Sequence, residues 1–305
     1  MRTMKLGKST LEVPVVSIGC MRINSLKKAE AEHFVHSALE LGANFFDHAD
    51  IYGSGTCEEI FAEAIHMNDD IREKIFLQSK CGIREGMFDF SKEHIIESVD
   101  GSLKRLNTDY LDILLLHRPD TLVEPEEVAE AFDILESSGK VRHFGVSNQN
   151  PMQIELLKKS VKQTIVANQL QLSITNANMI SNGINVNMEN DSAVNRDGSI
   201  LDYCRLNDIT IQPWSPFQYG LFEGVFLGND KFPKLNQKID EVANKYEVSN
   251  TTIAISWLLR HPANMQPVIG TMNESRFKDC CKASDILLTR EEWYGIYRAA
   301  GNVLP

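Results

Sequence analysis

Apolar and polar positions along the chain repeat in two alternating patterns. Short runs rich in β-branched and aromatic residues are each followed by a longer stretch whose apolar positions recur at helical spacing. Eight runs predict strands, at residues 15–21, 44–50, 74–82, 110–119, 141–148, 164–173, 210–217 and 265–271. The longer stretches predict helices at residues 27–42, 57–67, 91–106, 124–140, 151–161, 235–246 and 250–261.

Local signals agree with these boundaries. Ser91 is expected to cap a helix, and Pro125 and Pro151 suit the first turns of two others. Gly42 and Gly139 stand where two helices should end. Eight strand–helix repeats in 305 residues predict an α/β fold, a (β/α)8 TIM barrel that occupies residues 1–305 as a single domain.

Two segments depart from the repeat. Residues 176–198 are rich in asparagine and lack periodicity, so they are expected to form a long loop after the sixth strand, which has no clear helix behind it. Residues 218–233 carry three glycines among aromatic residues and are expected to form a loop after the seventh strand. A C-terminal helix that contains Trp293 is expected to pack over the barrel.

Composition narrows the classes of partner and the location. The formal net charge of −11 argues against nucleic acid or an anionic membrane as the main partner. No signal-peptide core and no apolar run of membrane-spanning length occur, so a cytoplasmic location is expected. Reduced thiols and no metal site are expected because no C-x-x-C pair or metal-ligand spacing joins the six cysteines, Cys20, Cys57, Cys81, Cys204, Cys280 and Cys281.

Polar side chains stand where several predicted strands end. Asp47 ends the second strand, with Tyr52 five residues later, Lys80 ends the third, and His117 ends the fourth. Catalytic groups of a (β/α)8 barrel gather at this end of the strands. The four side chains are therefore expected to meet at the mouth of the barrel.

These four residue types form a consistent chemical set. A tyrosine has a pKa of about 10, and a neighbouring lysine cation should lower it by stabilising the phenolate. Asp47 is expected to hold Lys80 charged and oriented, and His117 to hydrogen-bond a substrate carbonyl. Tyr52 would then be a general acid that protonates a developing alkoxide.

Such chemistry requires a hydride donor. No side chain donates hydride, so a nicotinamide cofactor is implied. No G-x-G-x-x-G motif follows a strand, and "GSGTCEE" at residues 53–59 lacks the strand–helix context of that motif. The cofactor must therefore be held in a way that differs from the Rossmann fold.

Five segments in order resemble the motifs of the aldo-keto reductase family, in particular its bacterial NADP(H)-dependent oxidoreductases with short loops. They are "FFDHADIYG" (45–53), "LQSKCG" (77–82), "LDILLLHRPD" (111–120), "GKVRHFGVSN" (139–148) and "PVIGTMNESRFKD" (267–279). The resemblance covers nearly the whole chain. It implies a (β/α)8 barrel enzyme that reduces an aldehyde or ketone to an alcohol with NADPH.

The resemblance also assigns roles to residues. Tyr52 would be the general acid, tuned by Lys80 and Asp47, with His117 orienting the carbonyl. It implies that Ser147, Asn148 and Gln169 hold the nicotinamide carboxamide and that Trp214 stacks on the ring. It places Ser215, Phe217, Gln218 and Gly220 along the pyrophosphate, and Gly270, Thr271, Met272, Asn273, Arg276 and Asp279 around the adenosine end.

One position departs from the family pattern. Many relatives carry a lysine against the 2′-phosphate of NADPH where this chain has Gly270. Arg276 is the main remaining cation there, and arginine suits phosphate. NADPH is favoured as the cofactor, and NADH stays open.

Plainer interpretations exist for single residues. Asp47 fits a helix cap, Lys80 a solvated lysine and His117 a core histidine, but the shared motif order favours the catalytic interpretation. His48 and Asp50 are expected to be structural, with Asp50 near the mouth. Arg276 and Asp279 are alternatively i,i+3 partners on one helix. The pocket is expected to be lined by Met21, Tyr52, Arg118 and residues 217–226, with Arg118 facing the substrate or pairing with Asp120.

Two rival functions remain at this point. One is a nicotinamide-binding regulatory or redox-sensing subunit with slow turnover, as in the potassium-channel β-subunits of this family. The other is a metal-dependent barrel hydrolase that uses His48, Asp50 and His117, which the spacing disfavours. The expected partner is a small-molecule carbonyl substrate, and a monomer or weak homodimer is expected.

Overall fold

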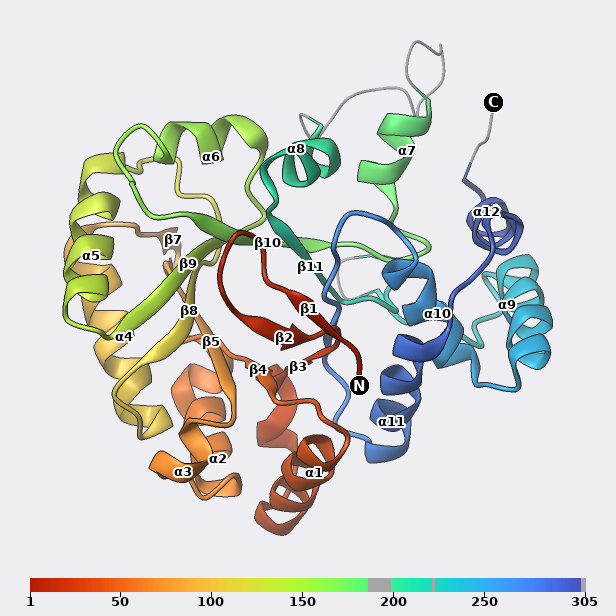
Figure 1. The fold of residues 1–305 in the computed structure, drawn as a ribbon, viewed down its shortest axis with the longest axis horizontal. Coiled ribbons are helices and arrows are strands. Elements are labelled where there is room, and N and C mark those ends of the chain that lie inside the picture. Colours follow the sequence, from red (N-terminus) through yellow and green to blue (C-terminus); the bar gives the residue numbers. More distant parts are fainter. Residues whose placement is uncertain (186–198, 221–222, 303–305) are drawn as a thin grey trace.

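Eight parallel strands form the centre of the protein. The computed structural model describes residues 1–185, 199–220 and 223–302. Its main sheet has the strand order β11-β10-β9-β8-β5-β4-β3-β12 and curves into a barrel surrounded by helices (Figure 1). A parallel bridge joins Ile211, in one end strand, to Met265, three residues before the other, so the barrel is nearly closed. The predicted (β/α)8 fold is confirmed. The barrel strands are β3 (Ser17–Gly19), β4 (Phe45–Asp47), β5 (Phe76–Cys81), β8 (Leu111–Leu116), β9 (Val141–Ser147), β10 (Ile165–Gln171), β11 (Thr210–Trp214) and β12 (Val268–Ile269).

Helices follow the strands where the sequence places caps. Ser91 accepts a hydrogen bond from the backbone N–H of His94, and Pro125 and Pro151 open two helices. The helices are α1 (Lys28–Glu40), α2 (Thr56–Ala64), α3 (Asp69–Arg72), α4 (Lys92–Leu106), α5 (Pro125–Ser137), α6 (Pro151–Leu157), α7 (Asn178–Ile184), α8 (Ile200–Asn207), α9 (Pro233–Tyr246), α10 (Asn250–Leu259), α11 (Glu274–Lys282) and α12 (Arg290–Ala299).

The expectation of a continuous loop over residues 176–198 is wrong for the part that the structure describes. Helix α7 lies within it, and α8 follows it, while residues 186–198 lie outside the described residues. The asparagine-rich α7 has weak helix propensity, and tertiary contacts stabilise it: Ile180 is buried, and the hydroxyls of Ser181 and Tyr297 are 2.8 Å apart. In α8, Ile200, Leu201 and Cys204 form the buried face.

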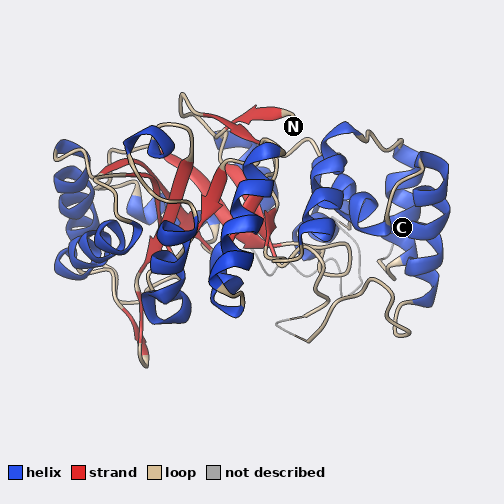
Figure 2. Cartoon of the chain, turned by 90° about the horizontal axis from the view of Figure 1, so that it is seen from below, coloured by secondary structure: helices blue, strands red, loops and turns tan. Residues whose placement is uncertain are grey.

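Two short hairpins that the sequence did not predict lie at opposite ends of the barrel (Figure 2). The strands β1 (Thr3–Lys5) and β2 (Glu12–Pro14) bring Leu6 and Val13 against Phe45 and Val166, which closes one end with apolar side chains. The strands β6 (Ile83–Arg84) and β7 (Met87–Phe88) follow β5 at the other end. Strands of two or three residues leave too little alternation for a sequence pattern to reveal.

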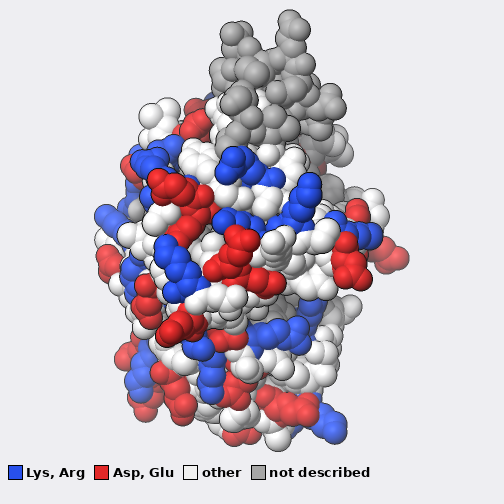
Figure 3. Space-filling model, turned by 90° about the vertical axis from the view of Figure 1, so that its right-hand side faces the viewer, with Lys and Arg blue, Asp and Glu red and all other residues white. Residues whose placement is uncertain are grey.

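The predicted C-terminal helix is present, and it packs against the outer helices α9 and α10. Trp293 of α12 stacks on Trp257 of α10 with ring centroids 4.6 Å apart, and each indole N–H donates to the backbone carbonyl of the other residue. On the outer face near α9 and α12, acidic and basic side chains are interspersed (Figure 3). All six cysteines are unpaired, as predicted, and all six are also buried. Within the described ranges, no helix combines the length and the apolar character needed to cross a bilayer.

Candidate active site

Asp47, Lys80 and Tyr52 are joined by hydrogen bonds at the mouth of the barrel. The Lys80 ammonium donates to Asp47 Oδ2 at 2.9 Å and to Tyr52 Oη at 3.0 Å. It also donates to the backbone carbonyl of His48 at 2.6 Å. The side chains of Lys80 and Asp47 are 0% and 2% exposed, so water does not screen this ion pair.

The loop after β4 places Tyr52 above Lys80. The backbone N–H of Tyr52 donates to the carbonyl of Ala49, and the chain then passes through left-handed conformations at Gly53 (φ 56°) and Gly55 (φ 93°) before α2 begins. A Cβ atom at Gly55 would lie 2.8 Å from Arg105 Cδ. The left-handed backbone angle therefore favours glycine at residue 55, and a larger residue would also have to displace the end of the Arg105 side chain.

His117 lies beside the tyrosine. Its ring packs edge-on against the Tyr52 ring at 5.9 Å between centroids, and its buried Nδ1 has no hydrogen-bond partner among the described residues. Burial, and then the positive charges of Lys80 and Arg118, hold the pKa of His117 well below its usual value. A neutral imidazole is therefore expected at physiological pH, with ring nitrogens suited to hydrogen-bond an uncharged carbonyl.

The pKa of Tyr52 differs from the sequence prediction. Burial raises the pKa of Tyr52, and although Lys80 lowers it as predicted, Asp47 raises it as well, so the net shift is upward. The predicted net lowering is therefore wrong. A raised pKa keeps the phenol protonated at neutral pH, which is the state that a proton donor needs.

A chain of buried glutamine amides lies beside Asp47. Gln78 Nε2 donates to Asp47 Oδ1 at 2.6 Å and to Gln212 Oε1 at 2.9 Å. Gln212 in turn donates to Gln266 Oε1 at 2.9 Å, and Gln266 donates to the carbonyl of Pro14 at 2.8 Å. The chain thus links the hairpin at one end of the barrel to the carboxylate at the other, and it fixes that carboxylate against rotation.

The sequence analysis did not identify Gln78, Gln212 or Gln266 as part of the site. The position of Gln78 could have indicated this, because it lies two residues before Lys80 on one strand and therefore faces the same side of the sheet. Gln169 was predicted to hold a nicotinamide carboxamide. Its amide nitrogen instead donates to Asp47 Oδ1 at 3.1 Å and to Gln212 Oε1 at 3.3 Å, so that nitrogen is already engaged.

Four of the predicted cofactor residues form one connected group. Ser147 Oγ donates to the carbonyl of Gln169 at 2.9 Å and accepts from Asn148 Nδ2 at 2.8 Å. The Trp214 indole N–H donates to Asn148 Oδ1 at 3.3 Å, and Asn148 has a left-handed φ of 56°. The indole is therefore held in place at the mouth, where its half-buried ring suits a nicotinamide that would stack on it.

Arg118 approaches the same indole. Its guanidinium carbon lies 5.7 Å from the centre of the Trp214 ring. The alternative partner, Asp120, instead accepts hydrogen bonds from the backbone N–H groups of Phe90 and Leu122. Arg118 therefore lies against the Trp214 ring, and the interpretation of Arg118 as the ion-pair partner of Asp120 is wrong.

The segment assigned to the pyrophosphate is tied to the end of β10. Ser173 Oγ donates to the carbonyl of Gln218 at 2.8 Å, and Gln171 Nε2 donates to that of Gly220 at 3.2 Å. Ser215 has a left-handed φ of 50°, and Phe217 is half-buried against the core. Residues 221–222, within the expected pocket lining 217–226, lie outside the described residues.

The segment assigned to the adenosine end surrounds the start of α11. Asn273 caps this helix by accepting the backbone N–H of Arg276 at 2.9 Å, and Thr271 Oγ1 accepts the N–H of Asn273 at 3.2 Å. Met272 is half-buried against the core. Asp279 pairs with Lys282 at 2.9 Å, so the alternative pairing with Arg276 is wrong. Arg276 is exposed, as a cation that meets a phosphate would be.

His48 and Asp50 do not form a metal site with His117. Among the residues that the structure describes, a single group of metal-type ligands comes together, and it is elsewhere in the chain. The ring of His48 packs on Phe61 with 4.6 Å between ring centroids, and in the part of the chain that the structure describes neither of its buried nitrogens has a hydrogen-bond partner. Burial lowers the pKa of His48 to about 3. These residues give the metal-dependent hydrolase hypothesis no support.

Asp50 is expected to make stability depend on pH. Burial raises the pKa of Asp50 to about 6. A raised carboxyl pKa means that the folded state favours protonated Asp50. The contribution of Asp50 to the free energy of unfolding is therefore fully present below about pH 4 and is lost as the pH rises through about 6. Asp50→Asn should therefore raise the free energy of unfolding by roughly 2 kcal/mol at pH 8 and change it little at pH 4.

Urea unfolding at the two pH values measures this effect. The surface variant Asp109→Asn is the control and should stay within about 0.5 kcal/mol of the wild type. A gain for Asp50→Asn that is equal at pH 4 and pH 8 would show that ionisation of Asp50 is not its cause.

Comparisons with known proteins agree with this geometry. The family model described as "Aldo/keto reductase family" matches residues 15–299. The chain is 35% identical over 295 residues to the uncharacterized oxidoreductase YcsN of Bacillus subtilis, with 92% of each chain covered. It is 32% identical over 304 residues to a 6-dehydroglucose reductase of Agrobacterium fabrum, with 95% of each covered. A crystal structure of the thermostable aldo-keto reductase Tm1743 with the inhibitor epalrestat superposes with a TM-score of 0.79 at 25% identity, covering 98% of this chain and all of that one.

Proposed function

This chain belongs to the aldo/keto reductase family of oxidoreductases, and we propose that it reduces an aldehyde or ketone to an alcohol with NADPH. The observation that carries the proposal is the buried Lys80 ammonium, which bonds to both Asp47 Oδ2 and Tyr52 Oη. A phenol that is held by a cation at the mouth of a barrel is a suitable proton donor for a carbonyl oxygen.

The chain supplies the proton and the charge balance. A bound nicotinamide supplies the hydride, which no side chain can donate. Tyr52 gives its proton to the carbonyl oxygen as that oxygen gains negative charge, and Lys80 stabilises the phenolate that remains. Asp47 balances Lys80, and the neutral His117 hydrogen-bonds the same oxygen and orients it.

The residues around Trp214 fit a nicotinamide. The indole is fixed by Asn148, and Ser147 and Asn148 present polar atoms beside it. The carboxamide would be held there, while the segment from Ser215 to Gly220 would follow the pyrophosphate and the start of α11 would meet the adenosine end. Gly270 has no atom within 4 Å of the position that a Cβ would occupy, so this end is open.

Gly270 offers a test of the cofactor phosphate. Gly270→Lys should lower the dissociation constant for NADPH by about three- to tenfold, because an added cation near the 2′-phosphate makes a charge-assisted hydrogen bond. Affinity for NADH should change little. Fluorescence titration with both cofactors measures the effect, with the uncharged Gly270→Gln as the matched control. Equal gains for both cofactors, or the same gain in Gly270→Gln, would show that no phosphate lies at this position.

The reaction itself is tested by following nicotinamide absorbance. Purified protein with NADPH should reduce members of a panel of aldehydes and ketones. The panel should include sugar-derived aldehydes, because the relatives from Agrobacterium fabrum and Novosphingobium aromaticivorans are named 6-dehydroglucose reductases. Arg118, whose guanidinium lies 5.7 Å from the centre of the Trp214 ring, would supply hydrogen-bond donors for the hydroxyl or acidic groups of such substrates.

A second outcome would favour a regulatory role. A relative from Oryza sativa that is 27% identical over 321 residues is named a probable voltage-gated potassium channel subunit beta. Tight binding of NADPH without turnover across the panel would assign this chain to that kind of function. Failure to bind either nicotinamide would overturn the proposal.

A further inference from the structure

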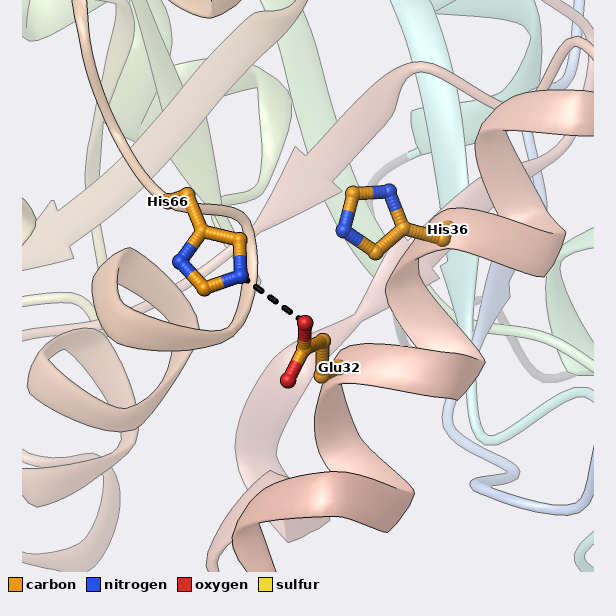
Figure 4. Close-up of side chains that lie close together, drawn as sticks. All are labelled: Glu32, His36 and His66. Atoms are coloured by element: carbon orange, nitrogen blue, oxygen red, sulfur yellow. Dashed lines mark hydrogen bonds and ion pairs between the residues drawn. The ribbon is translucent and has the colours of Figure 1, made fainter.

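Glu32, His36 and His66 lie together on the outside of the barrel, and we propose that they bind one divalent transition-metal ion of the zinc class. One potential ligand atom from each residue lies within 4.8 Å of the other two. Figure 4 shows the two imidazole rings facing each other beside the Glu32 carboxylate. This inference does not depend on the proposed reductase activity, because none of the three residues belongs to the barrel mouth.

The fold brings these residues together from two packed helices. Glu32 and His36 are four residues apart on α1, so they lie on the same face of that helix. His66 follows α2, which packs against α1. The sequence predicted no metal site, because a spacing of thirty residues between His36 and His66 matches no known metal motif and only the fold joins them.

The backbone holds His66 in an uncommon conformation. Its φ is 54°, a left-handed angle that glycine and asparagine adopt more readily than histidine. The backbone N–H of His66 donates to the carbonyl of Glu63, and its carbonyl accepts from Asn68 Nδ2 at 2.8 Å. His66 Nε2 lies 2.8 Å from Glu32 Oε1, so this conformation directs the ring toward α1.

His36 is the member of the group without a hydrogen-bond partner among the described residues. Its ring is half-buried and lies 6.2 Å from the ring of His66, between centroids. Lys28, which lies four residues before Glu32 on α1, pairs with Glu63 at 3.4 Å rather than with Glu32. The Glu32 carboxylate and both imidazoles therefore face a common space, and within the described ranges His66 is the one residue that forms a salt bridge with Glu32.

The donor set selects the kind of ion. Two imidazole nitrogens and one carboxylate oxygen suit Zn²⁺ and its neighbours Co²⁺, Ni²⁺ and Cu²⁺, whereas Mg²⁺ and Ca²⁺ prefer oxygen ligands alone. Zinc ligands lie about 2.0–2.1 Å from the ion, which separates them from one another by roughly 3.3 Å. Rotation of three exposed or half-exposed side chains meets this requirement, with water completing the coordination.

A bound ion would connect α1 to the end of α2. These helices follow β3 and β4, the neighbouring strands that lead to the barrel mouth. Because the site exists only in the folded chain, zinc should stabilise that state. At a hundredfold excess over its dissociation constant, zinc should raise Tm by about 5 °C.

Isothermal titration calorimetry of the EDTA-treated, dialysed full chain with ZnSO4 tests the site. We expect one zinc ion to bind per chain. In His36→Ala the dissociation constant for zinc should be at least tenfold higher, because the loss of even a residue that only supports a ligand lowers metal affinity by that factor. His66→Gly should show the same loss, with glycine suited to the left-handed angle. CaCl2 should give neither heat nor a rise in Tm.

His33→Ala is the matched control. His33 lies on the same helix with a 71% exposed side chain and is bonded to Glu274 rather than to this group. It should bind zinc as the wild type does. Wild-type affinity in His36→Ala, an equal loss in His33→Ala, or no stoichiometric zinc binding in the wild type would overturn the proposal. If His66→Gly does not fold, His36→Ala alone decides, because that residue has no hydrogen bond to lose.

Discussion

Replacement of Tyr52 by phenylalanine is expected to lower kcat for carbonyl reduction by roughly 10²- to 10⁴-fold. The phenol oxygen is the atom that Lys80 holds at 3.0 Å. Removal of one oxygen leaves the ring, and with it the edge-on contact to His117, in place. Nicotinamide affinity should therefore stay close to the wild-type value.

The measurement is steady-state NADPH oxidation together with fluorescence titration of the cofactor. Tyr246→Phe is the matched control, because it removes a phenol oxygen that bonds Glu292 on the outside of the barrel at 2.8 Å. Its kcat should match the wild type. If Tyr52→Phe retained more than about a tenth of the wild-type kcat, the proton would have to come from another donor, and His117 would be the next to test.

Lys80→Met is expected to be the most destabilising single change. It leaves the Asp47 carboxylate buried without its cation, which costs about 3–5 kcal/mol in the free energy of unfolding. It also removes the charge that stabilises the Tyr52 phenolate, so turnover should fall with it. Urea unfolding at pH 7 measures the first effect, and NADPH oxidation the second.

A double variant separates these two effects. In Asp47→Asn/Lys80→Met, the charge is removed from both partners, while the asparagine oxygen still accepts from Gln78 and Gln169. The double variant should recover much of the lost stability and none of the activity. Equal stability of the single and double variants would show that the unpaired carboxylate is not the cause of the loss.

The ion pair of Asp47 and Lys80 is expected to make stability depend on pH in the alkaline range. Burial lowers the pKa of Lys80, whereas Asp47 and then Tyr52 raise it. Together these two partners outweigh burial, so the net shift of the Lys80 pKa is upward. A cation whose pKa is raised by folding contributes stability that is fully present below the ordinary lysine pKa of about 10.4 and is lost above it. The wild type should therefore keep its advantage over Lys80→Met from pH 7 to pH 9 and lose it progressively above about pH 10.4.

The sequence was sufficient to predict which residues lie at the candidate site, because a simple rule of the fold places them there. Each of Asp47, Lys80 and His117 stands at or just after the end of a strand, and parallel barrel strands all end on the same side. Once eight strands were recognised, their last residues had to share one mouth. The helix starts marked by Ser91, Pro125 and Pro151 were also predictable from the sequence, since each of these residues acts within one helical turn.

Other features depended on contacts between distant residues. Helix α7 has little propensity of its own and is stabilised by contacts such as that between Ser181 and Tyr297, which are 116 residues apart. The partner of Asp279 was chosen by side-chain geometry on α11, where Lys282 reaches it and Arg276 does not. The pattern of apolar positions contains neither piece of information.

By itself, then, the sequence determined the (β/α)8 fold, most helix ends and which residues reach the barrel mouth. The hydrophobic period and the helix caps act locally, and the order of the strands places their ends by a simple rule. The tertiary structure alone decided the direction of the Tyr52 pKa, the glutamine chain from Pro14 to Asp47, and the meeting of Glu32, His36 and His66. Desolvation and hydrogen-bond partners depend on which segments surround a group in space. Those surroundings are fixed only when strands and helices distant in sequence pack together.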